Sequence, residues 1–339
     1  MIRVYSGLVR AFTIRAHEEA LDLGVSEVDP HPIDADDVLV EVYFSGVNFK
    51  DAMVAEPASR VRRVSDLVGG VDAAGVITES RVPGLEPGTP VAVHGGDLGV
   101  ARDGGFAEYV YAPARYLSPL AGALSPRSAM IIGTAGVSAM ASVLALEDHG
   151  VDPDGEILVT GATGGVGSMA VTLLAARGYR VVASTGSPDQ ADWLRERGAS
   201  RVIAREEVSD RPGRVLGSEL WAGAVDCIGG EMLGNVLRTL RYGAAVSATG
   251  LVAGADLVTT VYPFITRNVA LLGIDVVESP PATRQRVWTA LAALVPTIDL
   301  DPLVDSVIPL EGIPAALETV RRGATRGRIL VDPTARARA

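Results

Sequence analysis

The sequence predicts an α/β protein in which a β-rich domain accompanies a doubly wound parallel sheet. Three observations support this fold class. Short strands separated by glycine and proline fill residues 37–111, strands alternate with helices from residue 156 onward, and an apolar strand at 156–160 leads directly into a glycine-rich turn at 161–167. A chain of 339 residues is long enough for two such domains.

The N-terminal part predicts a folded-over β domain, because its strands are short and divided by turn residues. Four strands are expected, at residues 37–44, 70–77, 88–93 and 105–111. The pattern changes at Ser125-Pro126, where a capping residue followed by proline predicts the start of a helix. Alanine, methionine and leucine then continue the helical pattern to His149-Gly150.

The glycine turn has the spacing G-x-x-G-G-x-G over Gly161 to Gly167, and a helix is expected from about 168 to 176. A turn from a strand into a helix directs backbone N–H groups and the positive helix end toward an anion. Glycines allow the backbone to approach a pyrophosphate, which a side chain would prevent. The turn therefore predicts a dinucleotide site, with a tight turn that binds no ligand as the alternative.

The following 110 residues or so continue the alternation that a parallel sheet requires. Ser187-Pro188-Asp189-Gln190 predicts a capping box, and its helix is expected to end at Gly198. A helix near 282–294 then leads to a C-terminal segment that is expected to return to the first domain. The further strands are expected at residues 179–184, 201–204, 224–228, 244–250 and 269–274.

Composition limits the classes of function. The net charge of −11 argues against nucleic acid or an anionic membrane as a partner. One cysteine and four scattered histidines exclude a cysteine-rich zinc site, so no metal is expected. We find no apolar stretch of membrane-spanning length and no signal peptide in residues 1–6, and a cytoplasmic location is the default. Lys50 is the one lysine among 30 basic residues, which makes it a functional candidate or a partner of Asp51.

Six stretches are informative when taken together: Val47–Asp51, Gly70–Gly75, Ile132–Gly136, Gly161–Gly167, Leu220–Asp226 and Tyr262–Val269. In this order they resemble the medium-chain dehydrogenase/reductase superfamily, and within it the acrylyl-CoA reductase branch of the quinone-oxidoreductase-like group. The resemblance implies a GroES-like domain from residues 1–125 and 270–339, a Rossmann domain from 126–269, and a homodimer often joined through the sixth strand. Zinc-dependent relatives have His-Glu where this chain has Val71-Asp72.

The resemblance also implies NADPH as the cofactor. No acid stands at the end of the second strand to repel a 2′-phosphate, and related enzymes have an arginine where this chain has Ser187, which is alternatively a helix N-cap. A second family arginine is present as Arg205, whose alternative is an ion pair with Glu206 or Glu207. The residues expected to bind the cofactor are Phe49, Thr163, Gly164, Gly165, Val166, Gly167, Thr185, Gly186, Ser187, Arg205, Leu251, Ile265 and Val276.

The implied reaction is hydride addition to the β carbon of a small 2-enoyl thioester, with no zinc. Asn48 is the expected orienting donor, and Lys50, Asn48 or a bound water is the proton donor. Phe49 replaces a family tyrosine and could equally be a core residue, while Asp72 and Thr134 are weaker candidates. Arg63, in a cluster with Arg60 and Arg62, is the expected CoA contact or part of a solvated face. The alternatives are a quinone or enone reductase without CoA preference, and a non-catalytic NADP-binding protein.

Overall fold

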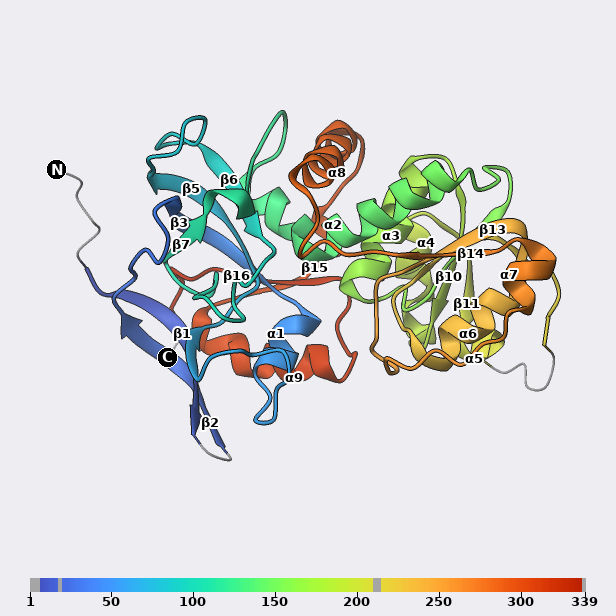
Figure 1. The fold of residues 1–339 in the computed structure, drawn as a ribbon, viewed down its shortest axis with the longest axis horizontal. Coiled ribbons are helices and arrows are strands. Elements are labelled where there is room, and N and C mark those ends of the chain that lie inside the picture. The colour runs from blue at the N-terminus through green and yellow to red at the C-terminus, as the bar shows by residue number, and fades with distance from the viewer. Residues whose placement is uncertain (1–6, 18–19, 210–214, 337–339) are drawn as a thin grey trace. The chain divides into compact units, whose positions relative to one another are not determined.

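The computed structural model describes residues 7–17, 20–209 and 215–336, and its chain forms two compact units (Figure 1). Unit 1 contains residues 1–134, 277–295 and 299–339, and unit 2 contains residues 135–276 and 296–298. Both boundaries lie later than the expected 125/126 and 269/270. The first follows Gly133, whose φ of 50° and ψ of −165° interrupt helix α2 (Pro126–His149). The second follows β14 (Ala270–Gly273), which pairs with β13 (Leu240–Ala248) and so belongs to unit 2.

Both ends of the chain build the main sheet of unit 1, whose strand order is β15-β16-β3-β5-β6-β8 with β7 paired to β3. The late strand β16 lies antiparallel to the early strand β3, which confirms the expected return of the C-terminal segment. A second sheet has the order β2-β1-β4. The strands are β1 (Val9–His17), β2 (Ala20–Val28), β3 (Asp37–Val47), β4 (Asp66–Val68), β5 (Asp72–Glu79), β6 (Pro90–His94), β7 (Tyr109–Pro113), β8 (Leu117–Pro119), β15 (Val304–Ile308) and β16 (Arg328–Val331).

Alternating apolar side chains fold unit 1 around its sheets. Val40 and Val42 of β3 and Val91 and Val93 of β6 lie in one buried cluster, as period-2 patterning requires. A second cluster contains Phe12 and packs the sheets against the helices α1 (Phe49–Val54) and α9 (Ile313–Arg321). The helix α8 (Pro281–Leu294) also belongs to this unit.

Unit 2 is a six-stranded parallel sheet of order β11-β10-β9-β12-β13-β14. In chain order this is 3-2-1-4-5-6, the doubly wound Rossmann order, and the sequence-based prediction is confirmed. Its first four strands are β9 (Glu156–Val159), β10 (Arg180–Thr185), β11 (Ala199–Ala204) and β12 (Trp221–Asp226). Its helices, besides most of α2, are α3 (Gly165–Ala176), α4 (Ala191–Glu196), α5 (Arg205–Ser209), α6 (Gly230–Thr239) and α7 (Tyr262–Arg267).

Two local predictions at helix starts are wrong. Helix α3 begins at Gly165, three residues before the expected start, because the glycine turn itself supplies the first helical turn. The capping box at Ser187 does not form, since Pro188–Gln190 is a short 3₁₀ helix without a side-chain cap and α4 begins only at Ala191. The Ser187 side chain is therefore not used as a helix cap.

Helix α2 is long and apolar enough to cross a membrane by length and composition, with a mean hydropathy of 1.9 in its best window. The expectation that no stretch reaches this length is thus wrong by that measure. However, 83% of this most apolar 18-residue stretch of α2 is buried inside the protein, as in the core helix of a globular domain. Residues 1–6, on which the signal-peptide prediction rests, lie outside the described residues.

Candidate functional site

The carboxyl ends of the unit 2 strands share one edge of the sheet, where doubly wound folds bind ligands. The turns after β9 and β10 meet there, because Ala162 N donates to Ser184 O at 3.1 Å. The hydroxyls of Thr163 and Thr185 lie 3.4 Å apart. The structure thus brings together the expected residues of the glycine turn and of the second strand end.

The glycine turn is shaped by backbone contacts at one end and is open at the other. A Cβ on Gly167 would lie 2.2 Å from Gly161 O, so no side chain fits between the turn and helix α3. A Cβ on Gly164 would contact only Gly161 O, at an ordinary 3.5 Å. The amides that open α3 have no carbonyl one turn earlier, and they point out of the helix end. This arrangement fits a diphosphate, which those N–H groups would hold.

Arg205 lies directly against the end of the second strand. A Cβ on Gly186 would lie 1.9 Å from Arg205 Nη2, so glycine makes room for the guanidinium. Both residues are exposed, and Ser187 follows, with its N–H bonded to Thr185 Oγ1 at 2.9 Å. A cation at this position, with no acid before Asp189, suits the extra phosphate of NADPH.

The other expected cofactor residues are less closely assembled. Leu251 follows β13 at the same sheet edge and is 47% exposed, whereas Ile265 on α7 is 73% exposed. Val276 is buried beyond β14. The described contacts do not join Ile265 or Val276 to the glycine turn, so their roles stay predictions.

Sequence reasoning missed Asp226, which pins the turns after β9 and β12. Its Oδ1 accepts from Thr160 Oγ1 at 2.7 Å and its Oδ2 accepts from Gly229 N at 2.7 Å. Burial raises the pKa of this carboxyl, and the two hydrogen bonds oppose that rise. An acid that ends an apolar strand is the signal that could have identified it, because a buried carboxyl needs such partners.

In unit 1 the expected catalytic residue Asn48 lies in a buried polar cluster. Its Nδ2 donates to Gly46 O at 3.1 Å and to Asp72 Oδ2 at 3.0 Å, while its Oδ1 accepts from Arg328 Nη1 at 2.9 Å. Both N–H donors of Asn48 are therefore committed within the protein. We conclude that Asn48 orients the cluster and has no spare donor for a substrate oxygen in this arrangement.

Arg328 is the second residue that sequence reasoning missed. It is 2% exposed, and its Nη2 lies 3.7 Å from Asp72 Oδ2. Burial lowers its pKa, while the charges of Asp72 and Asp51 oppose that shift. Gly46 and Gly133 are glycines here because a Cβ on either would lie within about 2.6 Å of Arg328 Nη2. No local motif marks Arg328, since its partners are more than 250 residues away in the sequence.

Asp51 caps helix α1 from within the same region. Its oxygens accept from Val71 N at 2.9 Å and Asn48 N at 2.8 Å. Burial and the nearby charge of Asp72 raise the pKa of Asp51 to about 7, although both hydrogen bonds favour the charged form. Phe49 and Lys50, the first residues of α1, are half-buried, and neither is placed against a ligand by the described contacts.

The arginine cluster expected to contact CoA divides into two kinds of residue. Arg62 donates to Val54 O, Glu56 O and Pro57 O, so it closes the turn after α1. Arg60 and Arg63 are exposed. The backbone N–H of Arg63 donates to Val100 O at 3.0 Å.

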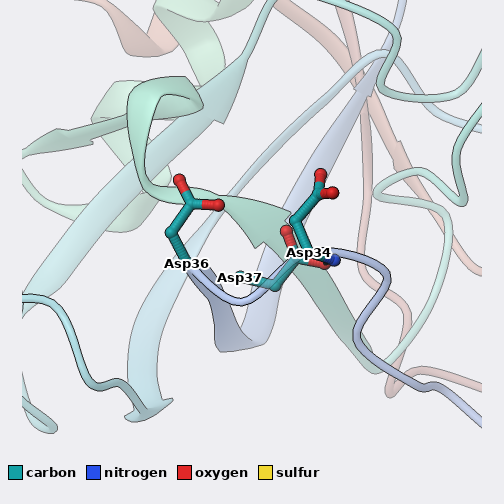
Figure 2. Close-up of side chains that lie close together, drawn as sticks. All are labelled: Asp34, Asp36 and Asp37. Carbon is teal, nitrogen blue, oxygen red and sulfur yellow. Dashed lines mark hydrogen bonds between the residues drawn. The ribbon is translucent and has the colours of Figure 1, made fainter.

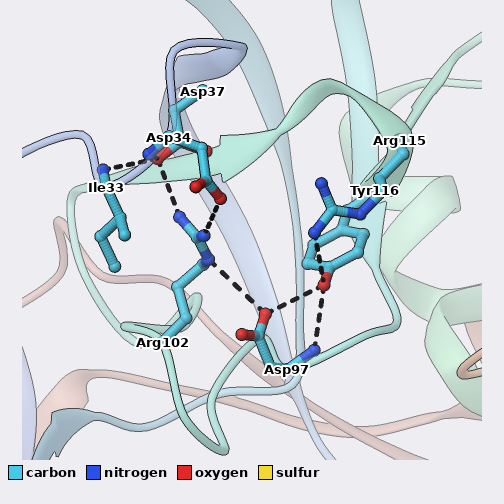
Figure 3. Close-up of polar contacts among 7 residues, drawn as sticks. All are labelled: Ile33, Asp34, Asp37, Asp97, Arg102, Arg115 and Tyr116. Carbon is cyan, nitrogen blue, oxygen red and sulfur yellow. Dashed lines mark hydrogen bonds and ion pairs between the residues drawn. The ribbon is translucent and has the colours of Figure 1, made fainter.

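Three acids at the start of β3, Asp34, Asp36 and Asp37, lie close enough together to resemble a cation site (Figure 2). Arg102 already provides positive charge there, since its Nη1 and Nη2 bond to Asp37 Oδ2 at 2.8 Å and Asp34 Oδ2 at 2.5 Å. Its Nε lies 3.5 Å from Asp97, which also accepts from the Tyr116 hydroxyl (Figure 3). The arrangement is a structural anchor for the loop at 95–102.

These features define a class of protein: a two-domain oxidoreductase in which a Rossmann sheet accompanies a GroES-like β domain. Family models agree, because the alcohol dehydrogenase GroES-like domain matches residues 34–122 and the zinc-binding dehydrogenase domain matches residues 165–294. The chain belongs to the medium-chain dehydrogenase/reductase superfamily, as the sequence predicted.

Several relatives are similar over almost the whole chain. Acrylyl-CoA reductase AcuI of Ruegeria pomeroyi is 43% identical over 300 residues, covering 88% of this chain and 91% of the relative. YhfP of Bacillus subtilis, whose name classes it as a candidate quinone oxidoreductase, is 40% identical over 96% of this chain and 99% of its own. Its crystal structure with NAD has a TM-score of 0.92, covering 96% of this chain and 100% of the other. Escherichia coli YhdH with bound NADPH has a TM-score of 0.90 at 39% identity, covering 95% and 99%.

Proposed function

We propose that this protein is an NADPH-dependent reductase of the C=C bond in a small 2-enoyl thioester, similar to acrylyl-CoA, and that it works without zinc. The observation that carries the cofactor part of the proposal is the position of Arg205 over Gly186, beside the open glycine turn. The similarity to an acrylyl-CoA reductase and to a structure that contains NADPH supports it.

The residues present fit the proposed cofactor. Thr163 to Gly167 would hold the diphosphate, and Thr185 to Ser187 with Arg205 would hold the 2′-phosphate end. Leu251, Ile265 and Val276 of unit 2 are proposed for the nicotinamide side. When bound, NADPH supplies a hydride to the substrate's β carbon. One similar structure contains NAD, so the preference for NADPH depends on the chain's own cation.

Reduction of the substrate places two requirements on the protein. As the β carbon gains the hydride, the C=C electron pair moves toward the carbonyl and leaves an enolate oxygen that needs a hydrogen-bond donor. The α carbon then takes one proton, which restores the carbonyl and completes the saturated thioester. We propose Lys50 as the source of that proton, with a bound water as the alternative, because both N–H donors of Asn48 are engaged.

A panel of substrates tests the reaction. With NADPH, crotonyl-CoA and acrylyl-CoA should be reduced, and a simple quinone should react more slowly. Arg63→Ala should raise KM for CoA esters about tenfold while KM for a free enone is unchanged, because the enone lacks the anionic arm. Arg60→Ala is the matched exposed control. Fast turnover of the quinone alone would contradict the thioester assignment and support the quinone reductase suggested by the YhfP relationship.

The cofactor preference has a sharper test. Arg205→Glu should raise KM for NADPH about 100-fold and leave KM for NADH within a factor of two or three, because a charge-assisted phosphate contact of about 2–3 kcal/mol is replaced by repulsion. Arg201→Glu, an exposed arginine on β11, is the control. An unchanged ratio of the two Michaelis constants would show that Arg205 does not meet the 2′-phosphate.

The third candidate function is NADP binding without catalysis. Phe49 has no hydroxyl and Val276 no side-chain hydrogen bond, so both weaken contacts that the family uses. NADPH binding by calorimetry, combined with no NADPH oxidation across thioesters, enones and quinones, would favour this candidate.

We also propose a homodimer in the cytoplasm. Strand β14 is an edge of the unit 2 sheet, and edge strands carry unpaired backbone groups. Exposed apolar side chains, Val258, Val261, Tyr262 and Leu271, are present in the same unit. Leu271→Asp should convert the dimer to a monomer in sedimentation velocity. A wild-type monomer would refute the dimer, and cell fractionation tests the location.

A further inference from the structure

A second buried polar group in unit 1, separate from the Asn48 cluster, lies at the end of β6. Trp288 Nε1, on helix α8, donates to His94 Nε2 at 3.0 Å, and the two rings lie 5.9 Å apart. His94 is 2% exposed and Trp288 is 6% exposed. Because Nε2 accepts a hydrogen bond, the neutral imidazole carries its proton on Nδ1. Burial and the nearby charge of Arg284 lower the pKa of His94 to about 3, so the ring is neutral at physiological pH.

Two N–H donors in this group have no acceptor. Nδ1 of His94 and Nε of Arg284 are buried and make no hydrogen bond to any of the described residues. Arg284 lies one helical turn before Trp288 on α8, is 7% exposed, and uses Nη1 to bond Arg115 O at 2.6 Å. Buried donors without partners are rare because they lose their hydration, and each one needs an explanation.

The strand register places His94 beside the Asn48 cluster. His94 is the direct cross-strand partner of Asp72 in the antiparallel pair of β5 and β6. Directly opposite residues have their side chains on the same face of a sheet. His94 therefore shares a sheet face with Asp72, whose carboxylate accepts from Asn48 Nδ2.

The surrounding backbone holds the donors rigidly. Gly96 N donates to Val277 O at 3.0 Å, which joins the turn after His94 to the segment that leads into α8. A Cβ on Gly95 would lie 2.7 Å from Arg284 Nη2, so the guanidinium is packed on that glycine. The Arg102 network anchors the other end of the loop (Figure 3). Fixed donors that need no rearrangement are those that stabilise a developing negative charge.

We propose that His94 Nδ1–H and Arg284 Nε–H form a binding site for a single oxygen acceptor, and that the acyl carbonyl oxygen of the enoyl thioester is its ligand. The proposal rests on the proposed function. Hydride addition gives this oxygen negative charge, Asn48 has no spare donor, and Phe49 has no hydroxyl. A guanidinium and a neutral imidazole N–H supply one positive charge and two donors away from solvent, where such bonds are strongest.

Kinetics of two matched variants test the assignment. His94→Phe keeps an aromatic ring but removes the donor, and it should lower kcat/KM for crotonyl-CoA about 100-fold to 1000-fold with little change in the Kd of NADPH. His94→Gln should retain most activity, because its oxygen can accept from Trp288 and its amide can donate. His31→Phe, at an exposed position, is the control. Equal losses in both His94 variants, following their loss of thermal stability, would show a structural role only.

An NMR experiment identifies the ligand directly. In protein labelled with ¹⁵N-histidine, the Nδ1–H resonance, assigned by its loss in His94→Gln, should shift when butyryl-CoA is added to the NADP⁺ complex. CoA alone and free butyrate should leave it unchanged, since neither presents the thioester carbonyl. A resonance that is identical in all three samples would overturn the proposal and indicate an ordered water as the acceptor. Wild-type enzyme that reduces no thioester would instead refute the proposed function.

Discussion

Arg328→Met is expected to destabilise unit 1 by about 3–5 kcal/mol, measured as the free energy of unfolding in urea at pH 8. The substitution keeps an unbranched side chain but removes the guanidinium whose charge offsets those of buried Asp72 and Asp51. Removal of Arg328 also takes away the hydrogen bond to Asn48 Oδ1. Arg328→Lys should lose less stability, because lysine retains the positive charge although it lacks the forked donors of a guanidinium. Arg60→Met, at an exposed position in the same unit, should change the midpoint little.

The pH dependence of the free energy of unfolding shows why Arg328→Met is destabilising. The pKa of Asp51 is already raised to about 7, above its ordinary 3.8, and the lost guanidinium raises it further. A carboxyl with a raised folded-state pKa gives stability that is complete below its unfolded pKa and is lost as pH rises through the folded one. The deficit of Arg328→Met should therefore be smaller at pH 5 than at pH 8. A deficit independent of pH would mean that lost packing, not uncompensated charge, explains the destabilisation.

The sequence predicted most of the features that depend on residues close together in the chain. The alternation of strands and helices after residue 156 and the glycine turn predicted the parallel sheet, and both are present because local periodicity determines them. The return of the C-terminal segment to the first domain was also expected, and the pairing of β16 with β3 confirms it.

The parts that could not be predicted depend on partners distant in the sequence. Arg328 meets Asn48 across 280 positions, and Trp288 meets His94 across 194. Nothing in the neighbouring residues of either shows a polar role, since a lone arginine or tryptophan fits many environments. The Ser187 capping box failed for the opposite reason: the local signal was good, but the adjacent turn bonds through Thr185.

A comparison of two single variants, Gly164→Ala and Gly167→Ala, should separate the folding of the glycine turn from its binding of a dinucleotide. Gly167→Ala places a methyl 2.2 Å from Gly161 O, so the turn must move and both thermal stability and NADPH binding should fall. Gly164 has a φ of −74°, and its new methyl would make only an ordinary contact within the protein. Gly164→Ala should thus fold with a Tm close to wild type.

NADPH binding should nevertheless weaken about 100-fold in Gly164→Ala, because the methyl occupies space that a diphosphate needs against the open end of α3. Calorimetry with NADPH and differential scanning of the free protein give the two quantities for each variant. Gly24→Ala, at an open glycine of β2 without a positive φ, controls for the general effect of losing a glycine. If Gly164→Ala binds NADPH as tightly as wild type, the diphosphate does not lie against this turn, and the cofactor site proposed for unit 2 is wrong.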